Sequence, residues 1–314
     1  MIAQKIRVNN YCDQLVSGHI FMFRFFHKIQ NKLFRSIQNF PLIKYHADIA
    51  YQKSIQEHTP YLPILSKSDL NIVKEIQNKG VAITSLEELG IISSPQILQA
   101  AQKLLPNIKA DINVQKHGFV VHASATQMIT YPEIFLWGLE QRLLNIIENC
   151  IRLPVAYHGA YFRRDIANQL EQGSRLWHID KEDRQVIKII IYINDVDERT
   201  GPFQYLTQSL TTEVAKSLHY KSGYLTNKTM QSVISSDQYQ SCTGSAGTVI
   251  FAATSSIFHR GKPPIDNDRF AIFFDYTAWR EKYLHYTTSH LTNEFLVKYF
   301  DQLSEAQKKY IYWE

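Results

Sequence analysis

A histidine and an aspartate that could bind a metal stand two positions apart in the segment LWHID, residues 176–180. This segment ends a stretch of β-like composition. Residues i and i+2 of a strand point to the same face, so the side chains of His178 and Asp180 can converge on one ion. An imidazole nitrogen and a carboxylate oxygen suit iron(II), and a second histidine would complete a facial triad that leaves positions open for a cosubstrate and oxygen.

His259 is the candidate for that second histidine. It follows a predicted strand at residues 248–253, and Arg269 opens the next predicted strand ten residues later. If these two strands pair, Arg269 points into the same cavity as His259. A guanidinium can hold a carboxylate through two parallel hydrogen bonds. A dicarboxylic cosubstrate such as 2-oxoglutarate needs such a partner at its distal end, while its 2-oxo acid end would chelate the iron.

The layout of these motifs resembles the phytanoyl-CoA dioxygenase family of iron(II)- and 2-oxoglutarate-dependent oxygenases. The resemblance covers about residues 64–280 and includes a helical lead-in at 66–83, WHID at 177–180, GPFQYL at 201–206, HRG at 259–261 and the arginine that follows. It implies a double-stranded β-helix (jelly-roll, cupin-like) core. It also implies that the Fe(II) ligands are His178, Asp180 and His259. Arg269 would then bind 2-oxoglutarate.

The chain departs from the family pattern in two places. After the glycine turn the family usually has a Pro-Gly-Ser-His run, where this chain has TQSL at residues 207–210. That run lies in a loop, so the change bears on substrate preference more than on the metal. Residues 1–60 have no counterpart in the family pattern.

The resemblance implies a reaction that uses O2 as well as 2-oxoglutarate. Decarboxylation of 2-oxoglutarate would give an iron(IV)-oxo species that abstracts hydrogen from the substrate, and hydroxyl rebound would follow. Related halogenases have Gly or Ala at the position of Asp180, so the carboxylate favours oxygen transfer. The expected function is hydroxylation of a small molecule, such as a secondary-metabolite or lipid-like intermediate. Desaturation or cyclisation by the same core, and the identity of the substrate, stay open.

Two further hypotheses differ in class. A cupin-like isomerase or dioxygenase without 2-oxoglutarate would normally carry a His-x-His pair with a glutamate, and no His-x-His pair occurs near His178. A non-catalytic, membrane-associated barrel protein is suggested by the basic N-terminal segment. Neither nucleophile elbow nor Cys/His pair supports nucleophilic catalysis.

The elements that must position these residues change character along the chain. Helical patterns occur at residues 66–80, 95–105 and 132–150. The first of these helices has Ser66 or Ser68 as its predicted N-cap and ends at Gly80. Residues 81–86 are predicted to form a short strand. Short segments rich in β-branched and aromatic residues then follow at 155–166, 185–194, 201–207, 247–254 and 269–279. Strands without long intervening helices indicate an antiparallel barrel or sandwich. The predicted fold is therefore mainly β with a helical buttress (α+β).

Strand alternation supplies further pocket candidates. In residues 185–194 the isoleucines at odd positions should pack on the helical layer, so Tyr192 and Lys188 look into the barrel. We expect Tyr192 to contact the cosubstrate and Lys188 the substrate.

In residues 155–166, alternation places Tyr157, Tyr161 and Arg163 on one face and His158, read as structural, on the other. Arg163 is a candidate cosubstrate ligand and Tyr161 a candidate substrate contact. For Tyr161 and Arg163 the alternative is a surface salt bridge. For Tyr192 and Lys188 the alternative is a plain structural role.

The net charge of +5 lies in the first 60 residues, which hold eight Lys and Arg against three acidic residues. No basic stripe covers the remaining chain, which argues against nucleic-acid binding. Residues 19–40 have a helical apolar period with a basic opposite face. This predicts either weak association with an anionic membrane surface or a helix packed on the catalytic body.

The predicted organisation is a basic helical extension at 1–60 and an oxygenase domain at 61–314. The domain comprises a helical lead-in (61–153), a β core (154–280) and a C-terminal helical tail (281–314). Three separated cysteines form no disulfide framework, and we find no signal peptide and no apolar run of about 20 residues. We therefore expect a cytoplasmic protein, peripheral to a membrane at most; the sequence leaves the oligomeric state open.

Overall fold

The computed structural model describes residues 41–109, 117–279 and 298–311. The chain divides into two compact units, Met1–Glu57 and His58–Glu314. The first contributes most of helix α2 (Pro41–His58) to the described residues. The helix expected at 19–40, with its membrane contact, and residues 281–297 of the expected tail lie outside the described residues. Among the described helices, none is long and apolar enough to cross a membrane.

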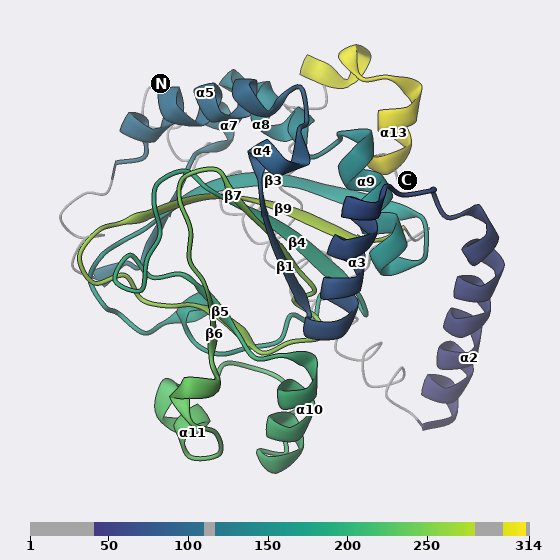
Figure 1. The fold of residues 1–314 in the computed structure, drawn as a ribbon, viewed down its shortest axis with the longest axis vertical. Coiled ribbons are helices and arrows are strands. Elements are labelled where there is room, and N and C mark those ends of the chain that lie inside the picture. Colours follow the sequence, from purple (N-terminus) through teal and green to yellow (C-terminus); the bar gives the residue numbers. More distant parts are fainter. Residues whose placement is uncertain (1–40, 110–116, 280–297, 312–314) are drawn as a thin grey trace, which may run out of the picture. The chain divides into compact units, whose positions relative to one another are not determined.

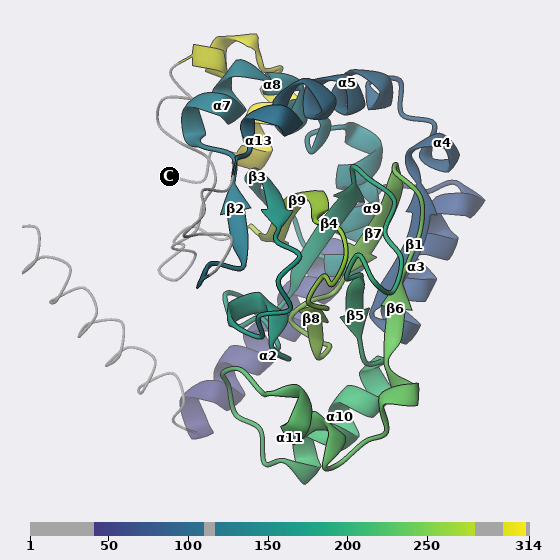
Figure 2. The ribbon, with the colours of Figure 1, turned by 90° about the vertical axis from the view of Figure 1, so that its left-hand side faces the viewer.

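The second unit contains a six-stranded and a three-stranded antiparallel sheet (Figures 1 and 2). The large sheet has the order β1 (Val81–Ser85), β7 (Thr248–Ala252), β4 (Val186–Tyr192), β9 (Arg269–Ala278), β3 (Val155–Asp165), β2 (Val120–His122). The small sheet has the order β6 (Gln240–Cys242), β5 (Phe203–Tyr205), β8 (His259–Gly261). The predicted antiparallel jelly-roll core is confirmed, and strands form at the segments predicted at 81–86, 155–166, 185–194, 201–207, 247–254 and 269–279. The sequence patterns missed β2, β6 and β8, each only three residues long.

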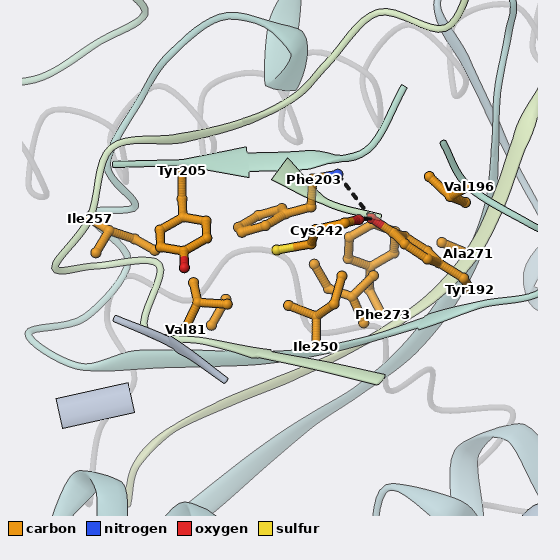
Figure 3. Packing of buried hydrophobic residues seen from close by; sticks show 12 residues of the cluster. Val81, Tyr192, Val196, Phe203, Tyr205, Cys242, Ile250, Ile257, Ala271 and Phe273 are labelled. Atoms are coloured by element: carbon orange, nitrogen blue, oxygen red, sulfur yellow. Dashed lines mark hydrogen bonds between the residues drawn. The ribbon is translucent and has the colours of Figure 1, made fainter. Parts of the chain in front are cut away.

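Aromatic and aliphatic side chains from both sheets form the core between them. Figure 3 shows Phe203 and Tyr205 of the small sheet packed opposite Val81 and Ile250 of the large one. All of these residues are at most 6% exposed. Because alternate residues of a strand point to opposite faces, the other face of the large sheet is left for the helices.

Helices cover that other face. Ile189 pairs with Phe274, and the ring of Phe274 lies 5.2 Å from that of Trp137 in α8. The described α-helices of this unit are α3 (Lys67–Lys79), α4 (Leu86–Leu89), α5 (Ser94–Leu104), α7 (Ala125–Thr130), α8 (Pro132–Trp137), α9 (Gln141–Ile151), α10 (Gln208–Ser217), α11 (Asn227–Gln231) and α13 (Glu305–Ile311). Helices α10 and α11 do not belong to this layer, because they pack with Trp177, Leu206 and Phe258. Ser66 caps α3 by accepting from the backbone N–H of Asp69, and Gly80 ends it with φ +88°, as predicted.

The single helix predicted at 132–150 is wrong, because the chain breaks at Gly138 into α8 and α9. A Cβ atom at this glycine would lie 2.4 Å from the hydroxyl oxygen of Tyr157. The hydroxyl of Tyr276 donates to the carbonyl of Gly138 at 2.8 Å. Two buried tyrosines of the sheet therefore pack against Gly138 at the break between the two helices.

A bulge in β3 corrects the predicted faces of this strand. The pairing with β9 shifts between Tyr157 and Ala160, and Gly159 between them has φ +97°. Tyr157 consequently faces the helices, where its hydroxyl donates to the carbonyl of Phe135 at 3.0 Å. It does not share a face with Tyr161 and Arg163, as simple alternation predicted.

Candidate metal centre

The two histidines of the candidate triad are joined through their backbones. His178 and His259 form an isolated antiparallel bridge, in which each N–H donates to the other's carbonyl, at 3.1 and 3.0 Å. The segment 176–180 thus contributes isolated bridges, not the end of a regular strand as expected. The backbone remains extended enough that His178 and Asp180 still meet. Asp180 is itself held by its N–H, which donates to the carbonyl of Thr254 at 3.0 Å.

The three side chains present one ligand atom each to a common point. Oδ1 of Asp180 lies 3.5 Å from Nε2 of His178 and 3.7 Å from Nε2 of His259. All three atoms lie within 4.8 Å of one another. Asp180 and His259 are buried, and His178 is nearly so. Two imidazoles and one carboxylate in this arrangement are the donor set of a facial triad for non-haem iron(II).

Backbone carbonyls determine which nitrogen of each histidine is available. Nδ1 of His178 lies 2.8 Å from the carbonyl of Leu176, and Nδ1 of His259 lies 3.2 Å from that of Ile257. A carbonyl only accepts hydrogen bonds, so Nδ1 carries the proton in both rings. Nε2 therefore keeps its lone pair toward the common point, as a metal ligand must.

The surroundings also set the charges of the triad. Burial lowers the pKa of His259 to about 3 and also lowers the pKa of His178. Burial by itself would raise the pKa of the Asp180 carboxyl, but Lys188 and the two histidines outweigh it and hold that pKa below its ordinary value. At neutral pH the site therefore offers two neutral imidazoles and one carboxylate, which is the protonation state that binds a divalent cation.

A second buried group in the same pocket consists of two arginines and an aspartate. Asp165 lies opposite Arg269 in the register of β3 and β9. Its Oδ2 is 2.9 Å from Nη2 of Arg269 and 2.9 Å from Nε of Arg163. Burial alone would raise the pKa of Asp165, but the two guanidiniums hold it well below its ordinary value. Asp165 was not among the predicted pocket residues; the Arg-x-Asp spacing on one strand face was the available signal.

Gly261, the glycine of the HRG motif, makes room for Arg269. A Cβ atom at Gly261 would lie 2.7 Å from Nη2 of Arg269. The same guanidinium donates through Nη1 to the carbonyl of Gly201. Arg269 is only 2% exposed, so its position is determined by these neighbours.

His259 and Arg269 do line one pocket, but not for the expected reason. The strands at 248–253 and 269–279, whose pairing was considered as the condition for this, do not pair, because β4 lies between β7 and β9. His259 instead begins β8 in the small sheet, and Arg269 begins β9 in the large one. The residues that line this pocket are Tyr161, Arg163, Ser174, His178, Lys188, Ile190, Tyr192, Phe203, Thr254, His259, Gly261, Arg269 and Phe273.

The other predicted pocket residues all lie in this lining, and their roles stay predictions. The hydroxyl of Tyr192 donates to the carbonyl of Cys242 at 2.8 Å and accepts from the N–H of Phe203 at 2.9 Å. The ring of Tyr161 stacks on Phe273, with centroids 4.9 Å apart. Tyr192 is thus engaged by the backbone of the core, and Tyr161 contributes a flat aromatic wall.

Tyr224 is an aromatic residue near the metal site that the sequence patterns did not indicate. Its ring lies 5.0 Å from that of His178 and is 57% exposed. The turn before it is closed by Tyr220, whose hydroxyl donates to the carbonyl of Gly223 at 2.7 Å. Tyr224 is therefore an exposed aromatic neighbour of the metal ligand candidate His178.

No protein-family model and no curated protein matches this sequence. Among solved structures, HygX from Streptomyces hygroscopicus with nickel, 2-oxoglutarate and hygromycin B is 16% identical, covers 69% of this chain and 90% of its own, and has a TM-score of 0.44. EctD from S. alaskensis with 2-oxoglutarate and 5-hydroxyectoine is 14% identical, with coverages of 68% and 76% and a TM-score of 0.46.

A third structure, the non-heme alpha ketoglutarate dependent epimerase SnoN from nogalamycin biosynthesis, is 10% identical, with coverages of 67% and 83% and a TM-score of 0.45.

Proposed function

We propose that this chain is an iron(II)- and 2-oxoglutarate-dependent oxygenase of the phytanoyl-CoA dioxygenase-like type that hydroxylates a small molecule. The observation that carries the proposal is one buried pocket with a two-histidine, one-carboxylate donor set and a pair of arginines among its walls. His178, Asp180 and His259 would hold the iron. When bound, iron(II) supplies the redox chemistry that couples dioxygen and a 2-oxo acid to oxidation of a substrate C–H bond.

The hydrogen bonds of Arg269 support its assignment to the distal carboxylate of 2-oxoglutarate. A guanidinium has five N–H groups. Among the described residues, the Asp165 carboxylate accepts from Nε–H and from one N–H of Nη2. The carbonyl of Gly201 accepts from one N–H of Nη1. One N–H on each terminal nitrogen is left, and two parallel N–H groups match a carboxylate.

The charges around the pocket also suit a dianionic cosubstrate. Three cationic side chains line the pocket, namely Arg163, Lys188 and Arg269. Three carboxylates pair with them, namely Asp165, Asp180 and Asp275. These charges balance before any metal is bound. A divalent cation adds two positive charges, which the two carboxylates of 2-oxoglutarate would neutralise inside a poorly solvated site.

Aromatic side chains from both sheets line the pocket. The ring of Phe203 stacks on that of His259, with centroids 5.5 Å apart, and is 6% exposed. Tyr161 and Phe273 form the stacked pair on the opposite sheet. The low polarity of these aromatic walls strengthens the interactions of Arg269 and of the triad with charged ligands.

The proposal is tested with purified protein under anaerobic conditions. Addition of iron(II) and 2-oxoglutarate should produce the weak visible charge-transfer band of an iron-bound 2-oxo acid, and admission of oxygen should release succinate. His178→Ala should abolish both signals. A wild-type protein that shows neither the band nor succinate release would refute the function.

The type of oxidation is tested once a substrate is found. Hydroxylation adds one oxygen atom to the product, whereas desaturation or cyclisation removes two hydrogen atoms, and mass spectrometry distinguishes the two. Incorporation of label from isotopic dioxygen into the product is the expected result for hydroxylation.

A further inference from the structure

The two oxygens of the Asp180 carboxylate have different surroundings. Oδ1 faces Nε2 of both histidines, at 3.5 and 3.7 Å. Oδ2 lies 3.1 Å from Nζ of Lys188. We propose that Lys188 is a positioning residue that holds Oδ2, so that Asp180 binds the metal through Oδ1 alone. This inference rests on the proposed function, because it requires a metal at the triad.

The position of Lys188 in the sheet directs its ammonium to Asp180. Lys188 lies in β4, between Ala252 of β7 and Asp275 of β9. Oδ1 of Asp275 is 4.0 Å from Nζ, so the ammonium lies between two carboxylates. Its side chain is 18% exposed, and that of Asp180 is 6% exposed. Ion pairs in such poorly solvated places are screened less than those on the surface.

The consequence concerns how many positions of the metal stay open. A carboxylate can bind a cation through one oxygen or through two. A facial triad with one oxygen leaves room for a chelating 2-oxo acid and for oxygen, whereas a second carboxylate oxygen would occupy one of those positions. By engaging Oδ2, Lys188 keeps that position available to the cosubstrate. This role differs from the substrate contact that strand alternation suggested for Lys188.

Lys181 provides a matched control. It follows Asp180 directly in the chain, but it is exposed and its ammonium lies 5.8 Å from the ring centre of Tyr220. Lys181→Met removes the same charge as Lys188→Met without removing the partner of Oδ2. A difference between the two variants therefore reports on the Lys188–Asp180 contact and not on net charge.

The experiment counts exchangeable waters on the bound metal. Manganese(II) is added to the wild type, Lys188→Met, Lys188→Arg and Lys181→Met, and water-proton relaxation is measured. We expect one fewer exchangeable water in Lys188→Met and unchanged numbers in the other two variants. The affinity of the manganese-loaded Lys188→Met protein for 2-oxoglutarate should fall about tenfold or more, the effect of removing a residue that orients a metal ligand.

Equal relaxation in Lys188→Met and wild type overturns the inference and leaves the proposed function intact. Failure of the wild type to bind manganese, iron or cobalt refutes the proposed function instead. Circular dichroism checks the fold of each variant. If Lys188→Met does not fold, Lys188→Leu is measured in its place under the same criterion.

Discussion

The two charged groups of the pocket are built in different ways. The arginine group lies within one sheet, because Arg163 and Asp165 belong to β3 and Arg269 of β9 is the cross-strand partner of Asp165. The metal group joins a loop to the small sheet, and a single backbone bridge between His178 and His259 connects them. The comparison indicates that the arginine group is preorganised by the fold, whereas the metal group depends on a few local contacts.

Removal of Asp165 should have a large effect on stability. Asp165→Asn leaves two buried arginines without their shared counter-charge, and breaking a buried ion pair costs about 3–5 kcal/mol. Chemical denaturation followed by circular dichroism measures this loss. A loss below about 1 kcal/mol would contradict the view that the arginine group is a structural part of the sheet.

The same residue predicts a dependence of stability on pH. The folded-state pKa of Asp165 is depressed, so its contribution is fully present above the unfolded pKa of about 3.9 and is lost as pH falls toward the folded value. The wild type should therefore lose stability on acidification below about pH 5, and Asp165→Asn should lose less over the same range. Denaturation curves from pH 7 downward compare the two slopes.

Removal of a metal ligand should affect binding far more than folding. His259→Ala keeps the backbone bridge to His178 but removes one of three donors, and we expect metal affinity to fall by more than about 100-fold, beyond the range for residues that only orient a ligand. Competition with a chromophoric chelator measures the affinity. Asp165→Asn should instead lower stability and leave the metal affinity of the folded protein unchanged.

Gly261→Ala should weaken cosubstrate binding at the arginine group without disturbing the metal. The new methyl group would approach Nη2 of Arg269 to 2.7 Å and displace the guanidinium. We expect an affinity for 2-oxoglutarate about tenfold lower, or about 1.4 kcal/mol. Calorimetry of the nickel-loaded protein measures it, and unchanged affinity would argue that Arg269 does not bind the distal carboxylate.

The smallest effect is expected at Tyr224, and Phe203 provides the contrast. Each ring lies beside one histidine of the triad, but Tyr224 is 57% exposed and Phe203 is 6% exposed. Tyr224→Ala should change the free energy of unfolding by no more than about 0.5 kcal/mol. Phe203→Ala should cost about 3–5 kcal/mol. Thermal and chemical denaturation of both variants test this difference.

Much of the fold could be predicted because its signals are local. Ser66 and Gly80 delimit α3 as expected, since a cap depends on only a few neighbouring residues. The main strands were predicted because β-branched and aromatic residues suit a half-buried pleated surface. The prediction failed at Gly138 and Gly159, where tertiary packing interrupts a helix and shifts a strand register.

The sequence by itself determined the residue types of the metal triad and their spacing along the chain. Alternation within one extended segment brought His178 and Asp180 to one side. Only the tertiary structure decided which segments meet. It placed β4 between β7 and β9, Asp165 against Arg269, and Lys188 against Asp180. The physical reason is that side-chain direction follows from the period of a single strand, whereas strand order and register depend on contacts between residues far apart in the chain.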